Sequence, residues 1–116
     1  MNSFKELLVW QKSRELVSAL YLTTSSLPES EKFGLTSQSR RAAVRIPSNI
    51  AEGYRRKNRK EYVYFLSISA GSAAELETQL ILINDIFKTD VTNLLKTLDE
   101  IQKMLSSLIN KLDPKA

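Results

Sequence analysis

The chain has 116 residues, a net charge of +4 and 42% hydrophobic residues, and it contains neither cysteine nor histidine. A chain of this length fits one domain, which we expect to span residues 1–116 and to bury a core without disulfides. The composition excludes thiolate chemistry and removes the commonest general base and metal ligand.

Patterns typical of export and membrane insertion are also missing. Charged residues begin at Lys5 and Glu6, which leaves no room for the apolar region of a signal peptide. No uncharged run reaches the roughly 20 residues that a helix needs to cross a membrane. We therefore expect a cytoplasmic protein with no membrane partner.

The first segment, residues 4–26, carries apolar residues at helical spacing. Its stripe consists of Trp10, Val17, Tyr21 and Thr24, and is widened by Leu7, Leu8, Leu16, Ala19 and Leu20. Leu27-Pro28 ends the segment, because a residue before proline avoids the α region.

A second helix is predicted from residue 28 or 31 to residue 54. Ala42, Ile46 and Ile50 recur every four residues and form its inward stripe. Pro47 lies inside this helix, removes the hydrogen bond to the Ala43 carbonyl and predicts a kink. Gly53 is read as the signal that ends the helix.

The third segment, residues 58–87, has the clearest pattern. Asn58 and Glu61 have the spacing of an N-cap and its capping-box partner. The stripe steps by three and four residues through Tyr62, Leu66, Ser69, Ala73, Leu76, Leu80, Ile83 and Phe87. Its middle is small, and Gly71 lowers helix stability by roughly 1 kcal/mol relative to alanine. We expect another backbone to approach closely there.

A fourth helix is predicted from Asp90, a good N-cap, to the Asp113-Pro114 pair. Its apolar residues again step by three and four: Val91, Leu94, Leu98, Ile101, Leu105, Leu108 and Leu112. Short connections make neighbouring helices antiparallel. The predicted fold is all-α, an up-down-up-down antiparallel four-helix bundle.

Some apolar residues fall outside the inward stripes. They are Val44 on the second helix and Phe65, Ile68, Leu82 and Ile86 on the third. Exposed apolar surface often marks an interaction site, so one hypothesis is self-association through these residues. The alternative is that they widen the core of a short bundle.

Basic residues concentrate between residues 40 and 60. This stretch holds eight of the seventeen, with Glu52 as the one acid: Arg40, Arg41, Arg45, Arg55, Arg56, Lys57, Arg59 and Lys60. A basic patch on a helix and its following loop indicates nucleic-acid binding. Ion pairing with acids of other helices or of other subunits, and simple solvation, are the alternatives. Tyr54, Tyr62 and Tyr64 flank the stretch and offer rings for stacking on bases, although Tyr62 has the spacing of a core residue.

No arrangement of residues indicates catalysis or a cofactor. A di-metal site in a helical bundle uses Glu-x-x-His repeats, and no glycine-rich phosphate loop is present. We expect a protein that is not an enzyme and that holds neither metal nor cofactor.

Several short motifs resemble the four-helix-bundle family of bacterial 23S rRNA intervening-sequence proteins. The most specific is Ile46-Pro47-Ser48-Asn49-Ile50-Ala51-Glu52-Gly53. The others are Leu8-Val9-Trp10-Gln11-Lys12, Leu27-Pro28 with Glu31, Phe33-Gly34-Leu35, Gln38, Arg41-Ala42-Ala43, and Ala70-Gly71-Ser72 with Glu75-Leu76. The family includes a relative that serves as the accessory variability determinant of diversity-generating retroelements.

The resemblance implies a homopentamer of bundles arranged as a barrel, which would account for the surplus apolar residues. For the retroelement relative it implies a basic surface that binds nucleic acid and a reverse-transcriptase partner. Three functions remain open: a nucleic-acid-binding accessory protein, a scaffold for an acidic protein, and a passenger of the inserted element.

The specific motif also suggests two roles for the polar residues of the basic stretch. We expect Arg41, Asn49 and Glu52 to form a local network near Pro47, with Ser48 bonded to a freed carbonyl. Residues 55–60, which lie outside the motif, would then supply the charges that contact phosphate.

Overall fold

The structure is a computed structural model that describes residues 3–115. Four long helices follow one another along the chain: α1 (Leu8–Thr24), α2 (Leu35–Tyr54), α3 (Arg59–Phe87) and α4 (Thr92–Leu112). Two short 3-10 helices precede α1 and α2, namely η1 (Phe4–Glu6) and η2 (Glu29–Glu31). The segment expected to start the second helix is therefore a separate turn, and α2 begins only after Gly34.

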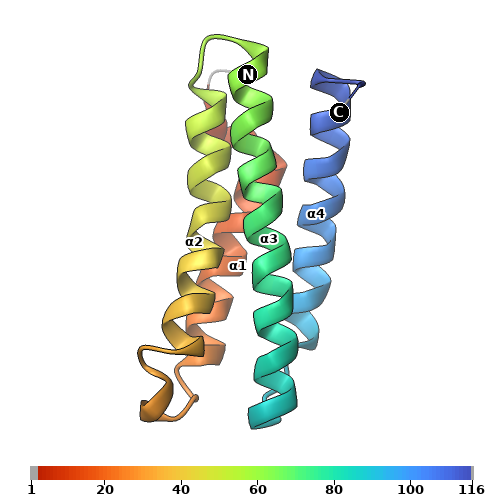
Figure 1. Ribbon diagram of the computed structural model, residues 1–116. Helices are drawn as coiled ribbons and strands as arrows, with labels where there is room; N and C mark the ends of the chain where they lie inside the picture. The colour runs from red at the N-terminus through yellow and green to blue at the C-terminus, as the bar shows by residue number, and fades with distance from the viewer. Residues whose placement is uncertain (1–2, 116) are drawn as a thin grey trace.

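The helices form an elongated bundle of 44 × 24 × 21 Å (Figure 1). Each packs against its neighbours in the chain and α4 closes against α1, while α1 and α3 lie diagonally, as do α2 and α4. This arrangement confirms the predicted up-down-up-down four-helix bundle. No helix in residues 3–115 combines the length and the apolar character that crossing a bilayer demands.

The core is a continuous apolar cluster to which all four helices contribute. The predicted stripes of α2, α3 and α4 supply most of its large side chains, including Ile46, Leu76 and Leu98, which are fully buried. Helix α2 runs through Pro47 without interruption, and the kink there stays a prediction.

The predicted stripe of α1 is partly wrong: Thr24 is buried as expected, but Trp10 and Val17 are only partly buried. The buried residues are Val9, Ser13, Leu16, Leu20 and Thr24, whereas Leu8 and Tyr21 are exposed. Two polar residues can lie in this core because each hydroxyl bonds a carbonyl of the preceding turn: Ser13 Oγ donates to Val9 O at 2.7 Å and Thr24 Oγ1 to Leu20 O at 2.8 Å. Thr24 belonged to the predicted stripe, whereas Ser13, a polar residue, was left out of it.

Helices α2 and α3 pack most closely, and Gly53 is one reason. It is buried and inside α2, so it does not end the helix as expected. A Cβ at this position would lie 2.9 Å from Phe65 Cβ and 3.2 Å from the Tyr62 carbonyl oxygen. A serine also crosses this contact, since Ser69 Oγ donates to Ile46 O at 2.9 Å.

Gly71 is different, because a Cβ there would meet nothing within 4 Å. The close approach expected at the small residues of α3 therefore occurs on their inward side. Gly71 itself faces away from the other three helices.

Candidate nucleic-acid interface

The α2–α3 connection, residues 55–58, lies at one end of the bundle together with the ends of the chain (Figure 1). Asn58 fixes the start of α3: its Oδ1 accepts from Glu61 N at 2.8 Å, and its Nδ2 donates to Glu61 Oε2 at 2.7 Å. The predicted N-cap is thus confirmed. We call Arg55, Arg56, Lys57, Arg59 and Lys60 the basic loop.

Two arginines of the basic loop are engaged within the chain. Arg56 pairs with Glu52 at 2.6 Å, approaches Glu61 at 4.0 Å and lies over the Phe65 ring. Arg55 stands over the Phe4 ring, with 5.3 Å between the guanidinium carbon and the ring centroid. These contacts tie the loop to its flanking helices.

The side chains of the other three cations of the basic loop have no partner in the described part of the chain. Lys57, Arg59 and Lys60 are exposed, and within residues 3–115 none of their side chains has a hydrogen bond, ion pair or cation–π partner. They also adjoin the N-terminus of α3, where the helix dipole favours anions.

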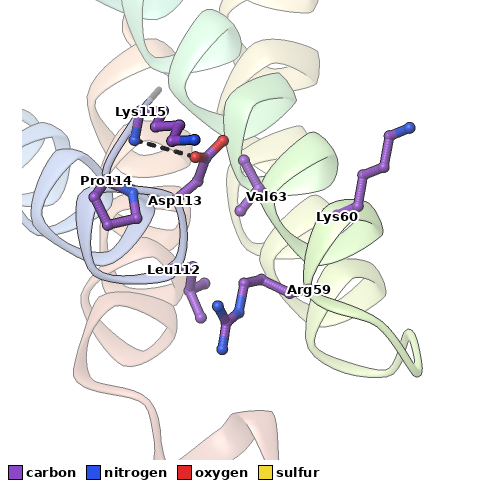
Figure 2. Close-up of a pocket in the computed structure, with 7 residues that line it drawn as sticks. All are labelled: Arg59, Lys60, Val63, Leu112, Asp113, Pro114 and Lys115. Carbon is purple, nitrogen blue, oxygen red and sulfur yellow. Dashed lines mark hydrogen bonds between the residues drawn. The ribbon is translucent and has the colours of Figure 1, made fainter.

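A cleft of about 450 Å³ opens beside this loop, between the start of α3 and the end of α4 (Figure 2). Arg59, Lys60 and Val63 line it from α3, and 112–115 line it from the end of α4. Sequence reasoning missed the α4 side. No sequence pattern predicts this side of the cleft. It forms only because α4 runs antiparallel to α3, which brings residues 112–115 beside the first turn of α3.

The remaining three predicted basic residues lie elsewhere, along α2. At about 1.5 Å per residue, Arg41 lies roughly 20 Å from the basic loop. Arg40 is held against α1, where its Nε donates to Thr24 Oγ1 at 2.9 Å and its guanidinium lies over the Tyr21 ring. Arg45 pairs with Glu75 of α3 at 3.7 Å, and Arg41 is exposed with no partner in the described part of the chain. The structure therefore divides the predicted patch in two.

The expected network of Arg41, Asn49 and Glu52 does not form. Arg41 lies two turns before Asn49, roughly 12 Å along the helix axis, which is beyond hydrogen-bond reach. Glu52 instead pairs with Arg56 one turn ahead, and Asn49 Nδ2 donates to Arg45 O at 2.8 Å. Ser48 is exposed, and its side chain makes no hydrogen bond to another residue in 3–115.

The three tyrosines have different surroundings. Tyr54 and Tyr62 meet edge to face, with their ring centroids 6.1 Å apart. Burial raises the pKa of Tyr62, and the nearby Tyr54 adds to the rise. Tyr64 is exposed and is the tyrosine whose ring remains accessible for stacking.

The surplus apolar residues lie on two separate surfaces. Val44, 39% exposed, joins Trp10, Val17 and Pro47 in a groove of about 440 Å³ between α1 and α2. Leu82 and Ile86, 41% and 58% exposed, lie near the other end of the molecule on α3. Ile68 and Phe65 are half-buried, and Phe65 is packed within its own chain against Gly53 and Arg56.

Acidic residues do not cluster as metal ligands would. Among residues 3–115 no group of three or more aspartates and glutamates is arranged to hold a metal ion.

Comparison with known proteins decides the family. The model of the 23S rRNA-intervening sequence protein family matches residues 5–107. The chain belongs to this family. Its fold is similar to the crystal structure of a protein of unknown function from the S23 ribosomal protein family of Bacteroides thetaiotaomicron VPI-5482. The TM-score is 0.79 at 25% sequence identity, over 88% of this chain and 98% of that one. No curated protein matches the chain.

Proposed function

We propose that this member of the 23S rRNA-intervening sequence family is a non-enzymatic, homo-oligomeric accessory protein that binds the backbone of nucleic acid. The basic loop is the binding surface, and the assembly is a pentamer. Its setting is a nucleoprotein, either an rRNA insertion element or a complex with a partner such as a reverse transcriptase.

One observation carries the proposal: Lys57, Arg59 and Lys60 are exposed cations that no acid of the described chain neutralises. Paired surface charges gain little by exchanging partners, whereas unpaired ones can neutralise phosphates and release counterions. The N-terminus of α3 adds backbone N–H groups at the same place.

The two apolar surfaces support the oligomer. A closed ring of identical chains is built from a heterologous contact, in which two different patches of one chain meet their counterparts on the neighbours. The α1–α2 groove around Val44 and the α3 face at Leu82 and Ile86 provide two such patches.

Binding is tested with a matched pair of triple variants. Replacing Lys57, Arg59 and Lys60 with glutamine should weaken binding of labelled duplex DNA by at least about tenfold at low salt, because three phosphate contacts disappear. The control replaces Lys32, Lys88 and Lys96, which are exposed and lie away from the basic loop, and removes the same charge. Fluorescence anisotropy measures both. Equal weakening by the two variants would contradict a localised site.

The assembly is tested by native mass. We expect Leu82→Asp with Ile86→Asp to lower the mass of the assembled particle, because charge would be buried at a subunit contact. Leu22→Asp, at another exposed leucine, is the control and should leave the mass unchanged. A wild-type protein that sediments as a monomer at all concentrations would overturn the pentamer.

A further inference from the structure

We propose that the cleft between α3 and α4 accepts one unstacked base of a single-stranded nucleic acid. This inference rests on the proposed function and assigns the basic loop a preferred ligand: a strand whose phosphates cross the loop while one base turns into the cleft.

The cleft has the size and lining of a small-ligand site. Its volume of about 450 Å³ falls within the roughly 300–1,000 Å³ of such sites. Apolar side chains form its walls, with Val63 on one side and Leu112 and Pro114 on the other. Figure 2 shows Arg59 turned towards Leu112, while Lys60 extends away from the other lining residues.

A phosphate is the wrong occupant for the interior. Asp113 lines the cleft, and its Oδ1 accepts from the backbone N–H of Lys115 at 3.2 Å. A carboxylate repels a phosphate, and apolar walls offer no compensation for burying its charge. A nucleobase is neutral and has two apolar faces. Its N–H groups can donate hydrogen bonds to a carboxylate such as that of Asp113.

The charges around the cleft suit the rest of the nucleotide. Arg59 and Lys60 belong both to the cleft and to the basic loop, so a strand on the loop is already at the entrance. The guanidinium plane of Arg59 can also stack on a base, as arginines do in proteins that bind single-stranded RNA. A duplex keeps its bases paired and stacked, so it can use the loop but not the cleft.

Abasic strands separate the two kinds of contact. A single strand and an abasic strand of equal length carry the same phosphates, so the basic loop contributes equally to both. We expect the wild-type protein to bind the normal strand at least about fivefold more tightly, the low end of what one stacked base contributes. The same difference in affinity between normal and abasic strands should appear with RNA and with DNA, because the cleft contacts the base and not the sugar.

A variant whose cleft is filled by a larger side chain is the second test. Val63→Phe should bring the ratio of the affinities for the normal and the abasic strand close to one. It should leave duplex binding unchanged, because the added ring fills the space between the apolar walls without removing charge. Asn93→Phe, which adds the same ring at an exposed position of α4 away from the cleft, should retain the wild-type ratio. Far-UV circular dichroism verifies that both variants are folded.

The outcomes distinguish the two proposals. If wild-type protein binds normal and abasic strands equally, the base site is wrong and backbone binding stands. Retention of the wild-type ratio by a folded Val63→Phe variant would equally overturn the cleft as the site. If no strand or duplex binds at low salt, the proposed function falls as well. The wild-type comparison does not depend on any variant folding.

Discussion

At the scale of single residues, the two α-helical glycines have opposite surroundings. Gly53 allows α2 and α3 to approach, because a Cβ there would lie 2.9 Å from Phe65 Cβ and close to backbone. Gly71 has open space around it. Sequence patterns flagged both glycines, but they placed the close contact along the small residues around Gly71 and assigned a helix end to Gly53. Spacing shows that a small residue is present, but not which neighbour it meets.

This contrast gives a paired prediction. Gly53→Ala should lower the free energy of unfolding by about 1–3 kcal/mol, because the added methyl overpacks a rigid contact. Gly71→Ala should raise it by about 0.5–1 kcal/mol, since alanine favours the helix and meets no obstacle. Urea unfolding at one protein concentration measures both. A Gly53→Ala protein as stable as wild type would show that the helices can separate without penalty.

Gln79 is a second residue whose environment the sequence does not reveal. It is 6% exposed within α3, and its Oε1 has no hydrogen-bond partner within the described chain. A buried acceptor without a donor costs about 1–3 kcal/mol. Gln79→Met keeps the shape and removes that cost, so we expect it to stabilise the fold by up to that amount.

Thermal unfolding compares this variant with a control on α4. Gln102→Met removes the bond from Gln102 Nε2 to Glu77 Oε1 at 3.0 Å and should bring no gain. A loss of stability in Gln79→Met would mean that Oε1 is hydrogen-bonded in the folded protein.

At the scale of helices, hydrophobic periodicity predicted the existence, order and approximate bounds of all four. It succeeded for α2, α3 and α4, where large apolar side chains define the inward stripe. It placed the face of α1 only partly correctly, because it left out Ser13, which occupies a core position with its hydroxyl bonded to the helix backbone. At the start of α4, Asp90 Oδ1 does accept from Thr92 N at 2.9 Å, although Val91 is the residue that precedes the helix.

An ion pair joins the first and last helices and makes stability depend on pH. Lys12 Nζ lies 2.9 Å from Glu100 Oε2, which holds the pKa of Glu100 below 4.5 and that of Lys12 above 10.5. A lowered carboxylate pKa contributes stability above its ordinary value, and that stability is lost as pH falls through the folded pKa. We expect the melting temperature to fall on acidification below about pH 4.5, and this loss should shrink in Lys12→Met.

On the alkaline side, the pKa values of Lys12 and of the half-buried Tyr62 are both raised, so the stability that they contribute is lost as pH rises above the ordinary pKa of each group. Lys103→Met serves as the control, because Lys103 pairs with Asp99 inside α4 at 2.9 Å and joins no second helix. An unchanged acid-side curve in Lys12→Met would contradict a role for this pair in docking α1 on α4.

At the scale of the whole molecule, charge differs between the two ends of the bundle. The basic loop and Lys115 lie at the end with the α2–α3 connection. At the opposite end, acids outnumber bases: Glu29, Glu31, Asp85 and Asp90 against Lys32 and Lys88. Charge counting found the basic stretch, residues 40–60, and the specific motif within it suggested that residues 55–60 have a role of their own. The helical rise separates Arg41 from the loop, Glu75 of α3 pairs with Arg45, and Glu52, one turn away in sequence, pairs with Arg56.

The salt dependence of binding tests most directly whether Lys57, Arg59 and Lys60 of the basic loop bind phosphate. Anisotropy titrations of duplex DNA across a series of salt concentrations give log affinity against log salt. We predict a linear fall, with a slope of about −0.9 for each neutralised phosphate, that becomes shallower when Lys57, Arg59 and Lys60 are replaced by glutamine. The slope should not change when Lys32, Lys88 and Lys96 are replaced. An affinity independent of salt, or the same slope in wild type and loop variant, would show that Lys57, Arg59 and Lys60 do not bind phosphate.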